Sequence, residues 1–560
     1  MTLPFALTAA FSQSAGARPN PHGPHTALPG AVHWTAAGSK YAKKMRCPQG
    51  PLCTEIYRSP RGGYVGHDEP ALNFYSGAAG SGNNVWTTMT LPKDATTKPS
   101  HGGVPNFEQH VAFWFGMAMC DNQSAPNPGG SPQGANVACK PNSDANAFTS
   151  NDPSNPKYIG LHPGVAFMEM QFYPPGWVDW PAGDSCAGQF YCAALNIDSL
   201  NENYNTGQIN NNDCLNKVGI EPANFAFITK NGVATGPANP LDATAATYTP
   251  DPTQDLFMKP GDRIKLHMFD TSAGFKVVIK DLTAGTQGSM TASAANGFGA
   301  IDFAPNAASC TVTDTNFHPA YATSSPKTRV PWAAHSYNVG YSDEIGHFEH
   351  CDPGAISGEG GDCFASSDDP EDIDPDNNYC FDAAASSLYK VTGCYGEDSD
   401  FDGPPYDFAW PGTGKTHAAD VALHGTPVTF TGLRYGSAAK RYSRVAFEAD
   451  LPRIESLTTP PCQRHVQNPR DASPGAGCRG LPAGASFYPI FTTHKVSTGC
   501  VWQEGGTKLP NTTNTFGGSS RTEFGNRLKH IVGLPYPSVG GGPVQVIYED
   551  YRHILSGNPC

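Results

Sequence analysis

The sequence is poor in charged residues and in residues that favour helices. Asp, Glu, Lys and Arg make up 15% of its 560 residues, and the formal net charge is −14. An acidic chain lacks the basic surface that nucleic acids and anionic membranes require, so we expect no nucleic-acid partner. No apolar run approaches the ~20 residues that cross a bilayer, so we also expect no membrane span.

Sequence motifs of several enzyme classes are absent as well. The chain contains no GxSxG elbow, no P-loop and no glycine fingerprint for a dinucleotide placed directly after a predicted strand. It also has no CxxC pair, which argues against zinc ribbons and thiol redox motifs. Chemistry that depends on a serine or cysteine nucleophile or on a nucleotide is therefore disfavoured, and we expect no required cofactor.

The residues that are abundant are typical of an extracellular β protein. The chain has 61 Gly and 51 Pro, and its 16 Cys lie singly along the sequence. An even number of well-spaced cysteines predicts a disulfide framework that forms in an oxidising compartment, and hence a secreted protein. Spacing favours local bridges between Cys47 and Cys53, Cys120 and Cys139, Cys186 and Cys192, and between Cys380 and either Cys351 or Cys363.

Composition divides the chain into five parts. Residues 1–17 combine a short apolar run with small residues, which predicts the remnant of a signal peptide. The later parts are an N-terminal arm over 18–70, a β region over 71–340, an acidic, Cys-rich insert or linker over 341–425, and a second β region over 426–560. The second β region forms either its own sandwich or part of the first one, and we expect helices within it at 521–532 and 544–555.

Alternating apolar and polar residues predict most of the strands. The clearest pair is 263–270 with 274–282, which predicts an antiparallel hairpin with one wet face. Further strands are expected at 83–91, 110–120, 164–173, 192–200, 426–435, 441–451 and 485–493. The expected fold is mainly β: an antiparallel β-sandwich of jelly-roll or concanavalin-like type, with one or two sandwich units, few short helices and many disulfides.

One predicted strand, GVAFMEMQFY from Gly164 to Tyr173, carries an acid within an apolar run. Side chains alternate along a strand, so Glu169, Gln171 and Tyr173 share one face with Phe167. A buried acid is costly unless it is paired or functional, which makes Glu169 and its neighbour Gln171 the first candidate catalytic residues. The strand resembles the acid-bearing strand of concanavalin-like β-glucanases, although Gln171 and Tyr173 stand where that pattern has further acids.

Two tryptophans, Trp177 and Trp180, follow the turn at 174–176 and offer aromatic faces on which a sugar ring can stack. Together with Tyr173 they are the candidate substrate-binding residues, and Glu169 is the candidate general acid. The alternative is that Glu169 is a hydrogen-bonded core acid and that the tryptophans only pack.

A second pair of candidate catalytic acids is Glu448 and Asp450, which alternate in VAFEADLP and therefore share one face of a strand. Two acids held close together can separate their pKa values and act as acid and base. The alternative is an exposed edge strand on which Arg444 neutralises Glu448.

A candidate calcium site begins with Asp398, Asp400 and Asp402, which alternate before Gly403. Alternating carboxylates followed by a glycine turn suit a hard cation on a tight loop. The twelfth position is Ala409 and not Glu, so this is not an EF-hand. We expect either a structural Ca²⁺ site in a β-loop or a solvated acidic loop.

The leading functional expectation is a secreted protein that binds or hydrolyses an extracellular polysaccharide in a β-sandwich groove. If it is catalytic, two carboxyl groups supply acid/base chemistry, and a polysaccharide or glycan is the partner. The first alternative is a non-catalytic, calcium-stabilised cell-surface or matrix protein. The second is a peptidase active at acid pH that uses Glu169 and Gln171, a pairing similar in general character to that of the glutamic peptidases.

Overall fold

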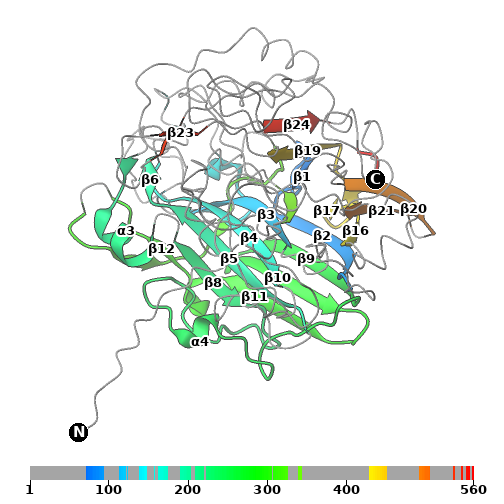
Figure 1. The fold of residues 1–560 in the computed structure, drawn as a ribbon, viewed down its shortest axis with the longest axis horizontal. Coiled ribbons are helices and arrows are strands. Elements are labelled where there is room, and N and C mark those ends of the chain that lie inside the picture. The colour runs from blue at the N-terminus through cyan, green and yellow to red at the C-terminus, as the bar shows by residue number, and fades with distance from the viewer. Residues whose placement is uncertain are drawn as a thin grey trace, which may run out of the picture.

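The computed structural model shows a chain built mostly of antiparallel β-strands (Figure 1). Within the part that it describes, no helix is long and apolar enough to cross a membrane. The structure describes residues 71–93, 113–121, 123, 138–147, 155, 157, 162–173, 190–203, 208–219, 222–304, 307–325, 339–343, 428–450, 491–497, 499–504, 534–536, 544–546, 550–554 and 558–560.

The first sheet has nine strands in the order β24-β19-β1-β15-β3-β4-β5-β8, with β14 beside β3. Its central strands are apolar on both faces, as FWFGMAMC in β3 illustrates, and such strands are stable only when both faces are covered. The strands are β1 Ala71–Tyr75, β3 Phe113–Cys120, β4 Val165–Tyr173, β5 Cys192–Leu200, β8 Ala223–Phe227, β14 His318–Pro319, β15 Gly340–Asp343, β19 Arg444–Asp450 and β24 Asp550–Ile554.

The second sheet also has nine strands, in the order β11-β10-β9-β2-β16-β21-β20, with β17 beside β2 and β18 beside β17. The hairpin predicted from the alternating pattern is confirmed: β9 and β10 pair antiparallel and bury every second residue. The strands are β2 Asn84–Thr90, β9 Arg263–Thr271, β10 Gly274–Asp281, β11 Gln287–Ala292, β16 Thr429–Thr431, β17 Arg434–Tyr435, β18 Lys440–Arg441, β20 Phe491–Val496 and β21 Gly499–Glu504.

The remaining elements are short. Two-stranded ladders form between β12 Gly299–Ile301 and β13 Val312–Asp314, between β22 Leu534–Tyr536 and β23 Val544–Val546, and between β6 Glu202–Asn203 and β7 Gln208–Ile209. The described helices are α3 Asn212–Val218 and α4 Ala245–Tyr248, with 3-10 turns η2 Asp144–Asn146 and η4 Ala294–Asn296. Few short helices were expected from the sequence, and this is what the described part of the chain contains.

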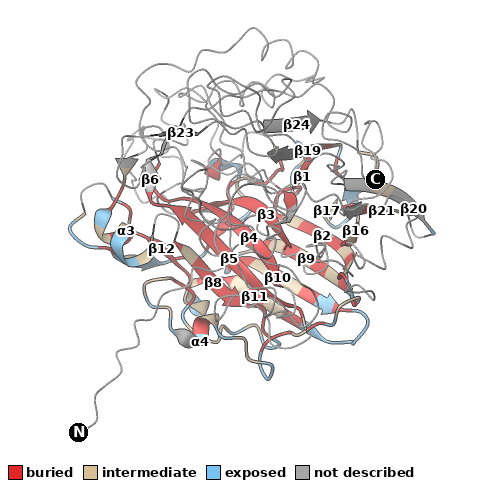
Figure 2. Cartoon of the chain, viewed as in Figure 1, coloured by how far each residue is buried: buried red, intermediate tan, exposed pale blue. Residues whose placement is uncertain are grey.

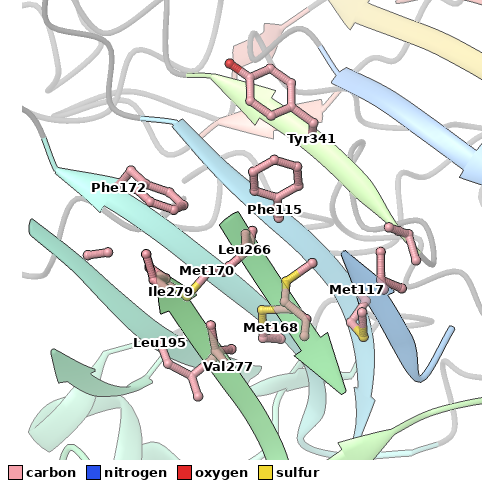
Figure 3. Close-up of a cluster of buried hydrophobic side chains, with 14 of the residues drawn as sticks. Phe115, Met117, Met168, Met170, Phe172, Leu195, Leu266, Val277, Ile279 and Tyr341 are labelled. Atoms are coloured by element: carbon pink, nitrogen blue, oxygen red, sulfur yellow. The ribbon is translucent and has the colours of Figure 1, made fainter. Parts of the chain in front are cut away.

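One hydrophobic core lies between the two sheets and takes side chains from both (Figure 3). Met168 and Met170 of β4 lie in the same cluster as Leu266 of β9 and Val277 of β10. Aromatic rings also contact across the two sheets, and the rings of Tyr341 and Phe430 have centroids 4.6 Å apart. The two sheets therefore pack face to face in a sandwich-like arrangement.

The two sheets differ in how their other faces are covered (Figure 2). All residues of β3, β4 and β5 are buried, so the first sheet is covered on both faces in its centre. The second sheet alternates buried and partly exposed residues along β2, β9 and β10, so one of its faces is wet. Polar residues in the centre of the first sheet are consequently buried, which is unusual for polar side chains.

Strands from both predicted β regions share both sheets. In the first sheet β19 pairs with β1, and in the second sheet β16 pairs with β2. The helix expected at 544–555 is wrong, because β23 and β24 occupy that segment and β24 forms a ladder with β19. The helix expected at 521–532 lies outside the described residues, as do the arm and residues 344–425 of the acidic insert.

Disulfides connect neighbouring and distant parts of the described chain. The predicted bridge between Cys120 and Cys139 is confirmed. Two further bridges close longer loops that local spacing did not reveal, and Cys192 is disulfide-bonded as well. These two bridges are Cys214–Cys310, with a sequence separation of 96, and Cys500–Cys560, with a sequence separation of 60.

Candidate functional site

Strand β4 places its two sets of side chains in different environments. Ala166, Met168, Met170 and Phe172 belong to the core between the sheets. The alternate residues point to the opposite face, which we call the outer face of the first sheet; they are Phe167, Glu169, Gln171 and Tyr173. Glu169 is 0% exposed, so this acid lies in the interior despite facing away from the main core.

Four polar side chains of the outer face, Glu169, Gln171, Tyr173 and Asn196, form one hydrogen-bonded network. Nε2 of Gln171 donates to Oε2 of Glu169 over 2.6 Å. Oε1 of Gln171 accepts from the hydroxyl of Tyr173 and from Nδ2 of Asn196 on β5. Gln171 is therefore the centre of the network: its amide donates to the acid on one side and accepts from two donors on the other.

A second acid, Asp198, lies on β5 beside this network. The ladder pairs Glu169 with Asn196 and Phe167 with Asp198, so Glu169 and Asp198 are diagonal neighbours on the outer face. Gln171 and Asn196 have the same diagonal relation one step along the ladder, and their side chains are in contact. Diagonal neighbours in an antiparallel pair have Cα atoms about 7–8 Å apart and Cβ atoms somewhat closer.

The environment of Asp198 favours the protonated form of its carboxyl group. The residue is 2% exposed, and burial raises its pKa well above the ordinary value of 3.8 because the charged form loses its hydration. Asp198 consequently stays protonated at pH values at which exposed aspartates are ionised. Glu169 is equally buried, and it differs from Asp198 in the hydrogen bond that the Gln171 amide donates to its Oε2.

Apolar groups surround these acids. A Cβ atom at Gly116, which pairs with Glu169, would lie 2.5 Å from the ring of Trp114, so glycine leaves the space that this indole occupies. On the other side, Tyr173 packs with Phe225 of β8 in a second, smaller hydrophobic cluster. The network thus has aromatic side chains on two sides, and this apolar setting lowers the local dielectric constant.

The second pair of predicted acids lies far from the first. Glu448 pairs with Ala71, and the ladders continue through Ser342 and Trp114 to Gln171, so Glu448 and Gln171 occupy one row across the sheet. Four strand spacings of about 4.8 Å separate β19 from β4 by roughly 19 Å. The structure therefore does not bring Glu448, or Asp450 at the end of β19, together with Glu169.

Other predicted site residues lie outside the described part of the chain. These are Trp177 and Trp180, the candidate stacking platforms, and Asp398, Asp400 and Asp402, the candidate calcium ligands. Among the residues that are described, no three side chains of His, Cys, Asp or Glu form a metal-binding group. Of the sequence candidates, the structure thus brings together Glu169, Gln171 and Tyr173.

Asp198 and its neighbour Asn196 are the residues of this face that the sequence analysis missed. The signal is present in β5, whose sequence CAALNIDSL places Asn196 and Asp198 at alternate positions among apolar residues. That alternation is the same pattern that identified Glu169. Its meaning depends on the β4–β5 register, however, and the sequence alone does not give this register.

Comparison of the chain with known protein families, curated proteins and solved structures finds no match.

Proposed function

We propose that the chain hydrolyses an extracellular polysaccharide, with Asp198 as proton donor and Glu169 as its carboxylate partner. The observation that carries the proposal is the placement of these two buried carboxyl groups as diagonal neighbours on one sheet face. Diagonal neighbours lie about 7–8 Å apart along the backbone, a spacing compatible with the separation of about 6.5–9.5 Å between the carboxyl groups of inverting glycoside hydrolases.

The two environments support different roles for the two acids. Glycoside hydrolysis needs one carboxyl group that protonates the leaving oxygen and one carboxylate that acts as base or nucleophile. Asp198 has a raised pKa and suits the first role, while Glu169 accepts a hydrogen bond from Gln171 and suits the second. The acid role expected for Glu169 from the sequence thus passes to Asp198 in this proposal.

The test compares the wild type with Glu169→Gln and Asp198→Asn on a panel of polysaccharides, with release of reducing ends as the readout. We expect each variant to lose at least about 100-fold in rate while its melting temperature shows that it folds. Asp314→Asn is the matched control because it removes an exposed aspartate of β13. Release of no reducing ends by the wild type on any substrate, or full activity in both variants, would refute the proposal.

A second candidate function is non-catalytic binding at a cell surface or in a matrix. The complete burial of Glu169 favours it, because a buried and hydrogen-bonded acid can serve stability alone. In that case Asp198→Asn changes the melting temperature but leaves polysaccharide binding unaltered. Degradation of casein at acid pH, measured on the same variants, would instead support the peptidase alternative.

A further inference from the structure

The wet face of the second sheet carries positive charge although the chain as a whole is acidic. Strands β9 and β10 bury every second residue, and the residues between them are partly or fully exposed (Figure 2). The ladders place one residue each of β17 and β18 on the same face. We call this surface the basic face, and its basic side chains are Arg263, Lys265, Lys276, Lys280, Arg434 and Arg441.

No acid of the described strands balances these charges. The two aspartates of the hairpin strands, Asp270 and Asp281, lie in the buried set of alternating residues. The neighbouring strands β2, β11, β16 and β17 contain no Asp or Glu. The salt bridges found within the described part of the chain, at Asp213 and at Asp270, involve none of the basic side chains of this face. The basic face is therefore locally positive in a chain of formal net charge −14.

Two pairs of like charges stand directly opposite one another in the ladders. Lys265 pairs with Lys280, and Arg434 of β17 pairs with Arg441 of β18. Burial lowers the pKa of Arg434, and the charge of Arg441 lowers it further. Burial also lowers the pKa of His267, and Lys265 and Lys280 lower it further. Like charges at opposite positions destabilise a sheet, and a bound anion would relieve this repulsion.

Aromatic side chains lie between the two pairs of like charges. The ladders align Arg434, Trp86 and His267 in one row across β17, β2 and β9. Nζ of Lys265 lies 4.9 Å from the centroid of the Trp86 ring. The rings of His267 and Phe269 stack with their centroids 4.3 Å apart. The basic face thus combines cations with flat aromatic rings.

We propose that the basic face binds an anionic polysaccharide that carries sulfate or carboxylate groups on its sugar rings. The Lys and Arg side chains form charge-assisted hydrogen bonds with these groups, and the ring of Trp86 offers an apolar surface against which a sugar ring packs. From β18 to β10 the face spans four strand spacings of about 4.8 Å, or roughly 19 Å. Several linked sugar units can therefore contact it at once.

Charge and compartment favour a polysaccharide over a nucleic acid. The disulfides of the chain are compatible with an extracellular protein, and glycans are the common polyanions outside the cell. A net charge of −14 also repels a nucleic acid, whose charge is denser than that of a polysaccharide. Charged groups separated by uncharged rings match a face on which cations flank aromatic side chains.

The basic face is separate from the carboxyl pair of the first sheet. The hydrophobic core lies between the two sheets, so the basic face and the outer face of the first sheet are on opposite sides of the sandwich. Binding at the basic face requires neither Glu169 nor Asp198. The inference therefore goes beyond the hydrolysis proposed above and does not depend on it.

The experiment measures binding of the full-length protein to dextran sulfate and to unmodified dextran by calorimetry, at 50 and 200 mM NaCl. These two probes differ in charge alone, and polygalacturonate serves as a second polyanion with carboxylate groups. We expect binding to at least one polyanion and no binding to dextran. The affinity should fall at least tenfold between the two salt concentrations, because several ion contacts form together.

Lys265→Gln and Lys280→Gln should each weaken binding of the polyanion about three- to tenfold. Each change should also keep or raise Tm of the free protein, because it removes one member of a like-charge pair. Weaker binding without loss of stability distinguishes a ligand contact from a structural role. Lys217→Gln is the matched control, since it removes an exposed positive charge from α3 and should leave binding unchanged.

Three results would overturn the proposal. The first is no binding of the wild type to either polyanion, or equal binding of dextran. The second is the same loss of affinity in Lys217→Gln as in Lys265→Gln and Lys280→Gln. The third is tighter binding of single-stranded DNA than of both polyanions, which would assign the face to nucleic acid. Where a lysine variant fails to fold, Arg434→Gln and the comparison of the wild type on dextran sulfate and dextran decide.

Discussion

At the scale of single residues, several acids of this protein are buried. Asp255 is a further example: it is 0% exposed, Oδ2 accepts a hydrogen bond of 2.7 Å from the N–H of Asp251, and Oδ1 has no partner within the described residues. Burial raises the pKa of Asp255 from 3.8 to about 6, although the N–H of Asp251 favours the charged form. This residue therefore couples folding to pH.

The sign of this coupling follows from the two pKa values. The folded protein binds the Asp255 proton more tightly than the unfolded chain, so protonation contributes stability that is fully present below about pH 4. This contribution is lost as the pH rises through about 6. We predict that Asp255→Asn, which can keep the hydrogen bond from Asp251, raises Tm relative to the wild type at pH 7.5 and gives a smaller difference at pH 4.

Thermal unfolding of the two proteins across pH 4–8 measures this difference, and Asp314→Asn controls for the loss of one negative charge. A constant difference between Asp255→Asn and the wild type at all pH values would contradict the prediction. Because groups that do not contact Asp255 titrate equally in both proteins, the difference reports position 255 together with its neighbour Asp251.

Single residues also show which parts of the candidate site could be predicted from the sequence. Period-two alternation placed Glu169, Gln171 and Tyr173 on one face, and the structure joins these residues by hydrogen bonds. Asp198 was missed as the neighbour of Glu169 because that relation depends on the register of β5 against β4. Register follows from the packing of whole strands, and a local pattern does not contain this information.

At the scale of elements, the β9–β10 hairpin was the easiest prediction because a tight turn joins two alternating segments. Its turn requires Gly274, whose φ of +122° is a conformation that other residues rarely adopt. A Cβ atom there would also lie 2.3 Å from the carbonyl oxygen of Ala292 on β11. The hairpin and its third strand therefore approach each other closely at this position.

We predict that Gly274→Ala lowers the free energy of unfolding by about 2–3 kcal/mol through backbone strain and the clash together. Gly285→Ala is the matched control: Gly285 has a φ of +73°, but nothing lies within 4 Å of the position that a Cβ atom would take there. Its expected cost is about 1 kcal/mol. Urea denaturation measures both values, and equal losses would show that the approach to Ala292 is unimportant.

The helix predicted at 544–555 was wrong because a local pattern did not decide the structure of this segment. Its apolar residues fit a helical period, yet Asp550–Ile554 forms strand β24 and pairs with β19. A strand at the edge of a sheet gains ladder hydrogen bonds that an isolated short helix does not replace. The local pattern was ambiguous, and the distant partner decided the structure.

At the scale of the whole molecule, packing between the sheets holds together segments that are far apart in the sequence. Phe430 of β16 contacts Phe74, Phe115 and Tyr341, which belong to three strands of the opposite sheet. The ring is 1% exposed, so every contact that it makes is part of the interior. Phe430 therefore connects the two sheets through its ring contacts.

We predict that Phe430→Ala lowers the free energy of unfolding by about 3–5 kcal/mol, since it removes a buried ring and leaves a cavity between the sheets. Val233→Ala provides the comparison, because Val233 is 57% exposed and its truncation should change stability by less than about 0.5 kcal/mol. Chemical denaturation of both variants tests the prediction. A loss below about 1 kcal/mol in Phe430→Ala would mean that the sheets do not depend on this contact.

The pairing of β1 with β19 has a consequence for folding during synthesis of the chain. Ala71 and Glu448 are ladder partners, yet the second emerges from the ribosome long after the first. At a synthesis rate of about 5–20 residues per second, the roughly 380 residues between them take on the order of 20–75 s to appear. Throughout that interval this edge of β1 has no native neighbour, so the nascent chain is exposed to mispairing at this edge.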